Sequence, residues 1–280
     1  MKIMDSIAFL QWALPQLSLS WRGFRKVRSQ VCKRIRRRMQ SLGLEDFAAY
    51  RDHLERYPQE WAMLDAFCRI TISRFYRDRN VFGVLRECVL PRLAQRAEQE
   101  RRDVTCWSAG CASGEEVYTL RIIWDLSLAH AHRGVALALL GTDADETMLA
   151  RASAGCYPWG SVKEMPIDWI DRCFERQGDL LCVKPAHRQD VSFLCQDIRR
   201  GMPEGPFDLI LCRNLLLTYF EPPLQMQVLH NLAARLRCGG HLVIGAHEAL
   251  PAGMAGFQTL ADSRAILRWH GNPASVDRTD

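Results

Sequence analysis

The sequence predicts an α/β protein in which a mostly parallel β-sheet, covered by helices on both faces, follows a small helical domain. Three observations predict this fold. Five short apolar runs, separated by further structured segments, lie in the last two thirds of the 280-residue chain. Several runs end in polar residues, as strands do where a doubly wound sheet binds a ligand. The first 70 residues show helical patterns and carry a dense basic charge.

The composition is typical of one sizeable α/β core with a smaller appendage, since 48% of residues are hydrophobic. No run approaches the roughly 18 apolar residues of a membrane span. The apolar stretch Ile7–Leu14 lacks a following cleavage site, so we expect neither membrane insertion nor a signal peptide. The 11 cysteines form no C-x-x-C pair and indicate reduced, buried thiols in a cytoplasmic protein. Those inside predicted strands are Cys106, Cys195 and Cys212. We expect no metal site, because only His130–His132 has a paired ligand spacing.

The predicted helical domain, residues 1–70, contains a strongly basic helix between Trp21 and Met39. An apolar helical stripe lies beneath its cations, and Gly43 ends the helix. The cations are Arg22, Arg25, Lys26, Arg28, Lys33, Arg34, Arg36, Arg37 and Arg38. Shorter helices are predicted over 45–55 and 60–69. The basic face is either simply solvated or a patch for an acidic partner. It carries no aromatic interleaving, so we expect no nucleic-acid binding.

The first predicted strand, from Val104, leads into the most informative stretch, Cys106–Glu116. Gly110 and its small neighbours allow a ligand to approach the backbone, and the start of the next helix adds free N–H groups. Glu115 and Glu116 at that helix start repel a phosphate, so a ligand with a cationic end such as S-adenosylmethionine fits better. The alternative is a tight strand-to-helix turn with capping acids. The stretch lacks the G-x-G-x-x-G spacing of a dinucleotide site.

The second predicted strand, Val135–Leu140, runs into Asp143. An acid at the carboxyl end of the second strand is placed to hold ribose hydroxyls. Asp143 could instead cap the next helix, but Asp145 serves that role equally well.

Polar residues also follow the later predicted strands. Asp197 follows the run 191–195, and Arg213 and Asn214 follow the run 207–212. Because Arg213 comes after near-continuous apolar positions, its charge needs a partner. A fifth strand is predicted over 241–247.

Four motifs, taken in order, resemble the chemotaxis-receptor glutamate methyltransferases of the CheR type. They are Ser73–Asp78, Trp107–Glu116, Thr142–Asp145 and Phe207–Asn214. The resemblance runs from about Arg25 to the end of the chain. It implies a Rossmann-like class I methyltransferase fold with S-adenosyl-L-methionine as cofactor.

The resemblance also implies a domain division. Residues 1–70 would form the helical domain that faces the acidic helical region of a receptor. Residues 71–90 would be a linker that contributes to the cofactor site, and 91–280 the cofactor-binding domain. An antiparallel β-subdomain would be inserted at about 178–195, and two strands near 257–260 and 265–270 would close the sheet.

The same resemblance implies the site residues. Those for the cofactor are Thr71, Ser73, Arg77, Gly110, Glu115, Glu116, Asp143, Asp197, Ile198, Arg213 and Asn214. Between the two adjacent glutamates, we favour Glu116 for the methionine ammonium. Arg77 and Tyr219 are the implied catalytic residues, with Arg77 steering the acceptor carboxylate. The alternative for Arg77 is a salt bridge to Asp78 or Glu87. A glutamate acceptor is already ionised at neutral pH and needs no general base.

Three positions depart from the family pattern. Thr71 stands where the family usually has Asn, four residues rather than three separate Asn214 from Tyr219, and Gly245–Glu248 replaces Gly-His-Ser-Glu. We therefore expect methyl transfer, most simply to glutamates of an acidic helical protein that docks on the Arg22–Arg38 helix. The alternative is a methyltransferase for a small molecule or another carboxylate. The polar residues at strand ends disfavour a non-catalytic module.

Overall fold

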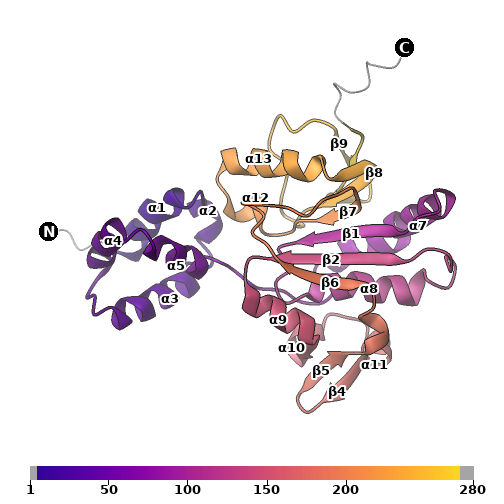
Figure 1. Cartoon of the computed structure of the whole chain (residues 1–280), viewed down its shortest axis with the longest axis horizontal. Helices are drawn as coiled ribbons and strands as arrows, with labels where there is room; N and C mark the ends of the chain where they lie inside the picture. Colours follow the sequence, from indigo (N-terminus) through magenta and orange to yellow (C-terminus); the bar gives the residue numbers. More distant parts are fainter. Residues whose placement is uncertain (1–4, 272–280) are drawn as a thin grey trace. The chain divides into compact units, whose positions relative to one another are not determined.

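The structure is a computed structural model that describes residues 5–271. The chain forms two compact units (Figure 1). The first consists of Met1–Ile70 with Leu215–Gln225, and the second of Thr71–Asn214 with Met226–Asp280. The helical N-terminal unit therefore includes a segment from far along the chain.

The first unit is helical. Its elements are α1 (Ser6–Gln16), α2 (Trp21–Phe24), α3 (Arg28–Ser41), α4 (Phe47–Arg56), α5 (Glu60–Phe67) and α12 (Leu216–Tyr219). Asp5 and Asp46 cap α1 and α4 by accepting backbone N–H bonds. The core holds fully buried Phe9, which packs its ring against Tyr50 at 5.7 Å between ring centres. Gly43, at φ +68°, follows the end of α3 as expected.

The single basic helix predicted from Trp21 to Met39 is wrong, because the chain breaks between α2 and α3. Phe24 is buried at the end of α2, and Val27 leaves helical geometry with ψ 3°. Arg28 fixes this turn by donating to the Arg25 carbonyl at 2.8 Å. The apolar stripe of α3 is buried as predicted.

The second unit contains a seven-stranded sheet in the order β6-β2-β1-β7-β8-β10-β9. Its strands are β1 (Val104–Ala109), β2 (Leu137–Asp143), β6 (Val191–Cys195), β7 (Phe207–Leu211), β8 (Leu236–Val243), β9 (Phe257–Leu260) and β10 (Ser263–Trp269). The first five in the order run parallel, and β10 and β9 close the sheet as antiparallel strands. The predicted mostly parallel sheet is confirmed (Figure 1).

Helices cover this sheet and set the positions of its loops. They are α6 (Arg79–Val84), a π-helical turn (Leu85–Val89), α7 (Leu90–Gln99), α8 (Glu115–Ser127) and α9 (Glu146–Ala154). Two short helices, α10 (Trp159–Val162) and α11 (Ile167–Cys173), instead contact strands of a second, smaller sheet. A 3₁₀ turn follows at Pro185–His187, and α13 spans Pro222–Ala233. The helices α8 and α9 contact β2 and β6, whereas α7 contacts β1. In the sheet core, buried Trp107 donates its indole N–H to Thr142 at 3.0 Å.

A second, three-stranded antiparallel sheet has the order β3-β5-β4. Its strands are β3 (Cys156–Pro158), β4 (Phe174–Gln177) and β5 (Leu180–Val183). The insertion thus lies within 156–183 rather than at 178–195. The later run, 191–195, is β6 and pairs in parallel with β2 of the main sheet.

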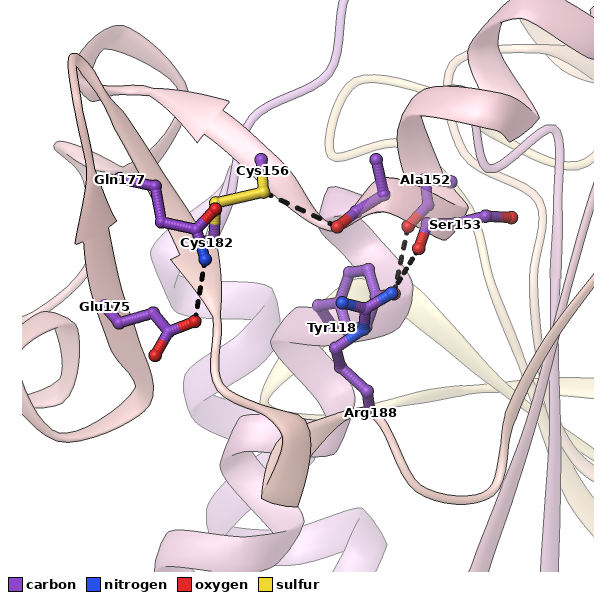
Figure 2. The surroundings of a disulfide bond; sticks show 9 residues. Tyr118, Ala152, Ser153, Cys156, Glu175, Gln177, Cys182 and Arg188 are labelled. Carbon is purple, nitrogen blue, oxygen red and sulfur yellow. Dashed lines mark hydrogen bonds between the residues drawn. A yellow bond between two sulfur atoms is a disulfide. The ribbon is translucent and has the colours of Figure 1, made fainter.

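A disulfide joins Cys156 and Cys182 in this small sheet (Figure 2). The two residues are directly opposite each other on β3 and β5, with Cα atoms 3.9 Å apart. The expectation that all cysteines are reduced and buried is therefore wrong for this pair, because strand pairing brings their sulfurs together. Cys106 and Cys212 are buried thiols as predicted, whereas Cys195 is exposed.

Candidate active site

The loop after β1 is held tightly against the end of β2. The N–H groups of Gly110 and Cys111 both donate to the Thr142 carbonyl, at 2.8 and 2.9 Å. Gly110 has φ +76°, and Gly114, at φ +85°, precedes α8. A Cβ on Gly114 would lie 2.9 Å from the Ala152 side chain. The small residues of this loop are therefore required by close packing as well as by backbone conformation.

Asp143 braces the same loop from the end of β2. Its carboxylate accepts the Ala112 N–H at 2.8 Å and the Asp145 N–H at 2.9 Å. Asp145 caps α9 by accepting from Thr147 and Met148. Of the two roles weighed for Asp143, the helix cap thus belongs to Asp145.

Arg213 stands at the centre of an ion-pair cluster. Its guanidinium contacts Glu116 and Asp78, each at 2.6 Å, and also donates to the Arg77 carbonyl at 3.0 Å. Only 4% of its side chain is exposed. Ser108 donates to the other oxygen of Glu116 at 2.8 Å. The buried charge of Arg213 is therefore paired with two carboxylates. Together, one arginine and two carboxylates carry a net negative charge.

The adjacent glutamates have different surroundings. Glu115 is buried and accepts hydrogen bonds from the Ser113 and Ser73 hydroxyls, and its burial raises its pKa. Glu116 belongs to the Arg213 cluster and keeps 13% of its side chain exposed. Glu116 is therefore the more accessible carboxylate of the two.

Arg77 lies in the segment that leads into α6. Its guanidinium donates to the Ile72 carbonyl at 3.0 Å. Within residues 5–271, Asp78 pairs with Arg213, Glu87 pairs with Arg86, and no carboxylate forms a salt bridge with Arg77. The alternative salt bridges weighed for Arg77 are therefore not formed. Thr71 lies in the same segment and is half-buried.

The segment after β6 also reaches this edge of the sheet. The Gln196 N–H donates to the Asp143 carbonyl at 2.9 Å. Asp197 pairs with Arg199 at 2.6 Å, and Ile198 is buried.

Asn214 is held by a residue that the sequence-based site list did not include. The Glu248 carboxylate accepts the N–H groups of Asn214 and Gly245 at 3.0 and 2.6 Å. Asn214 itself has φ +53°. The glutamate of the Gly245–Glu248 motif is the signal that could have identified this role.

The inserted sheet supports the loop after β1. Tyr157 of β3 is fully buried, and its hydroxyl donates to the Ser113 carbonyl at 2.7 Å. Burial raises the pKa of Tyr157, so the phenol remains a hydrogen-bond donor. Nothing in the sequence pattern indicated this contact.

The predicted site residues do not all belong to one unit. The eleven residues predicted for the cofactor lie within Thr71–Asn214 of the second unit, whereas Tyr219 belongs to the first. There its ring packs on Phe24, with 5.0 Å between the ring centres.

Two models of one protein family match this chain. Residues 71–266 match the SAM-binding domain of CheR methyltransferases, and residues 26–67 match the CheR all-alpha domain. The chain belongs to the CheR methyltransferase family. Its sheet is accordingly that of a class I methyltransferase, and S-adenosylmethionine is its cofactor.

Named relatives agree with the CheR assignment. A chemotaxis protein methyltransferase of Listeria monocytogenes is 33% identical over 73% of this chain and 75% of its own length. Chemotaxis protein methyltransferase 2 of Pseudomonas aeruginosa is 30% identical over 78% of this chain and 77% of its own. An uncharacterized 104.1 kDa protein of Rhodobacter capsulatus is 31% identical over 89% of this chain, which spans only 26% of that protein.

Among solved structures, the N-methyltransferase NodS of Bradyrhizobium japonicum aligns with a TM-score of 0.34 and 16% identity. The alignment covers 70% of this chain and all of NodS. Across residues 5–271, no helix combines the length and apolar character needed to cross a membrane.

Proposed function

We propose that this CheR-family chain methylates glutamate carboxylates of an acidic helical protein, such as a chemotaxis receptor, in the cytoplasm. The observation that carries the proposal is the arrangement around Arg213. This cluster keeps a net negative charge for a cationic cofactor. The carbonyl of Arg77 accepts a hydrogen bond from Arg213, whereas the Arg77 guanidinium forms no salt bridge with any carboxylate in the described part of the chain. The names of the CheR relatives support the same substrate class.

The residues present fit the cofactor. The Asp143 carboxylate lies at the end of β2, where it is proposed to accept hydrogen bonds from the ribose hydroxyls besides the two backbone N–H bonds that it accepts. The Glu116 carboxylate keeps acceptor capacity for the methionine ammonium, and the Gly110 backbone allows close approach. The remaining cofactor contacts in the proposal are Thr71, Ser73, Glu115, Asp197, Ile198, Arg213 and Asn214.

S-adenosylmethionine supplies a methyl group on a sulfonium, whose leaving group is neutral. The protein therefore has to align the acceptor and exclude water rather than transfer a proton. An acceptor glutamate is ionised at neutral pH. Arg77 orients that carboxylate by a charge-assisted hydrogen bond. Tyr219 is the second proposed acceptor-side residue.

The first unit offers a basic surface for an acidic acceptor. Seven exposed cations of residues 21–41 form no salt bridge among the described residues. They are Arg22, Arg25, Lys26, Arg28, Lys33, Arg36 and Arg37. Arg34 and Arg38 instead point inward. Arg34 donates to the carbonyls of Phe67, the last residue of α5, and of Arg69, and Arg38 pairs with buried Glu60 at 2.7 Å.

This distinction defines the test of the docking surface. The variant Lys33→Glu/Arg37→Glu reverses two exposed charges without touching the core. The control Lys163→Glu/Arg172→Glu reverses two exposed cations of the second unit. Transfer of labelled methyl groups to a purified receptor cytoplasmic fragment should fall at least about tenfold in the first variant alone, and the difference should shrink in high salt. Equal methyl-transfer rates in both variants would show that this basic surface does not dock the acceptor.

The same methyl-transfer assay identifies the product and tests Arg77, and calorimetry tests Asp143. Label on the receptor should be base-labile, as a carboxyl methyl ester is. Arg77→Ala should lower turnover about 100-fold, because a preorganised cation is lost. Asp143→Ala should weaken cofactor binding by about 2 kcal/mol in calorimetry. Label found only in small molecules of a host lysate would instead select the alternative of a small-molecule acceptor.

A further inference from the structure

A cavity of about 290 Å³ lies at the closing edge of the main sheet. Arg92 and Arg96 of α7 line it together with His241 of β8 and Arg268 of β10. His241 is within β8 rather than at the carboxyl ends of β1, β2 and β7, where the proposed cofactor residues lie. The cavity is therefore separate from the proposed methyl-transfer site.

Strand register brings the polar residues of this cavity to one face. Arg268 is directly opposite His241 on the neighbouring strand and opposite Gln258 of β9 on its other side. Directly paired residues project to the same face of a sheet. Arg92 and Arg96 project from α7 into the same cavity.

One residue that lines the cavity has a buried polar atom without a partner. His241 is only 6% exposed, and its Nδ1 has no hydrogen-bond partner among the described residues. A buried polar atom without a partner costs free energy unless a ligand or water binds it. Burial, together with the charges of Arg268, Arg92 and His270, lowers the pKa of His241 to about 4.

The charges around His241 are unbalanced. Ten residues line the cavity, and none of them is acidic. Arg96 is committed to Glu100 at 2.7 Å and to the Cys238 carbonyl at 2.6 Å. Arg92 and Arg268 form no salt bridge within the described part of the chain and are exposed to solvent. Two guanidinium groups without a carboxylate partner therefore line the same cavity as His241.

We propose that this cavity is a second ligand site, which binds a small molecule through a phosphate monoester. A phosphate dianion balances the two free guanidinium groups, which bind its oxygens in the bidentate manner typical of arginine. A third oxygen reaches the imidazole of His241. The volume suits a small metabolite, because ligand pockets begin at roughly 300 Å³. Leu93, Leu260 and Ala261 provide apolar contacts for its remainder.

The test uses the full-length protein and three probes, which are inorganic phosphate, ribose 5-phosphate and malonate. Calorimetry at low salt should show saturable binding of ribose 5-phosphate, weaker binding of phosphate and the weakest binding of malonate. Arg92→Gln/Arg268→Gln should weaken ribose 5-phosphate binding at least about tenfold. Arg264→Gln, an exposed arginine on β10 outside the cavity, should leave it unchanged.

Side-chain NMR of His241 provides a readout that diffuse surface charge would not change. Ribose 5-phosphate should shift the His241 imidazole signals in the wild type and raise the pH at which they titrate, because a bound anion favours the imidazolium. Three results would overturn the site. They are the absence of saturable binding, an equal loss of ribose 5-phosphate affinity in Arg264→Gln, and binding that does not shift the His241 signals. Tighter binding of malonate than of both phosphates would overturn its ligand class.

Discussion

The packing of α2 against the 215–225 segment in the first unit depends on a single glycine. A Cβ on Gly23 of α2 would lie 2.1 Å from the Thr218 carbonyl oxygen, which is a backbone atom and cannot rotate away. Gly23→Ala should therefore lower the free energy of unfolding by about 2 kcal/mol or more. A Cβ on Gly83 of α6 would have no described atom within 4 Å apart from its chain neighbours and the backbone of its own helix, so Gly83→Ala should raise stability by about 0.5–1 kcal/mol. Urea unfolding measures the change in stability of both variants. Equal changes would contradict the close contact described for Gly23.

A histidine makes stability depend on pH. His187 lies 2.6 Å from the Asp125 carboxylate, and this hydrogen bond, with a further one to Cys173, raises the pKa of His187 to about 9. The folded state then holds a proton more tightly than the unfolded state. This contribution, up to about 3 kcal/mol, is complete below pH 6.5 and is lost as the pH rises through about 9.

Chemical denaturation at several pH values measures this effect. The wild type should lose stability between about pH 6.5 and 9, and His187→Gln should have a flatter profile over the same range. Parallel profiles would show that His187 does not titrate as described.

At the scale of site residues, the sequence predicted the polar groups but not their partners. Glu116, Asp143 and Arg213 were recognisable because each follows a strand or begins the next helix. The pairing of Arg213 with Asp78 joins positions 135 apart, and that of Arg38 with Glu60 joins positions 22 apart. No local pattern encodes such pairs, so two cations of the basic run were assigned to a surface when they stabilise the core.

At the scale of elements, strand length and burial decided what could be predicted. All five residues of β7 are buried, and burial on both faces gives the continuous apolar run that identified it. The strands β3 and β4 have only three and four residues, and Glu175–Gln177 of β4 are exposed. Without alternation or an apolar run, the sequence carried no signal for them.

The disulfide gives the inserted sheet a measurable stabilisation. Cys156 and Cys182 are 26 positions apart, and closing a loop of that length stabilises the folded state by about 3.5 kcal/mol. Cys156→Ser/Cys182→Ser should lower the unfolding free energy by that amount. A reductant should destabilise the wild type but leave the double variant unaffected. A wild type insensitive to reductant would show that the two thiols are not bonded.

At the scale of the whole molecule, the first unit depends on two separate stretches of chain. Leu19 and Phe220 form a β-bridge, and the Ser20 N–H donates to the Tyr219 carbonyl at 2.8 Å. Leu216 and Phe220 are buried within this unit. The CheR SAM-binding match begins at residue 71, so that part alone lacks the residues against which these side chains pack.

A chain that begins at residue 71 should therefore aggregate although it contains the whole SAM-binding match. Exposed apolar side chains of the 215–225 segment are the physical reason. Size-exclusion chromatography over a range of concentrations tests this, and Leu216→Ser/Phe220→Ser in the truncated chain should restore a monomer. A monomeric truncated chain without those substitutions would contradict it.

The contact between Tyr157 and Ser113 has a thermodynamic consequence. Tyr157 adjoins the disulfide residue Cys156, and its hydroxyl holds the loop that is proposed to receive the cofactor. If breaking the disulfide loosens that loop, the reduced protein binds S-adenosylmethionine more weakly. Linkage is reciprocal, so a saturating cofactor must then shift the thiol–disulfide equilibrium toward the oxidised form by the same factor. A redox titration with and without the cofactor would therefore measure the coupling free energy between the disulfide of the inserted sheet and the loop after β1.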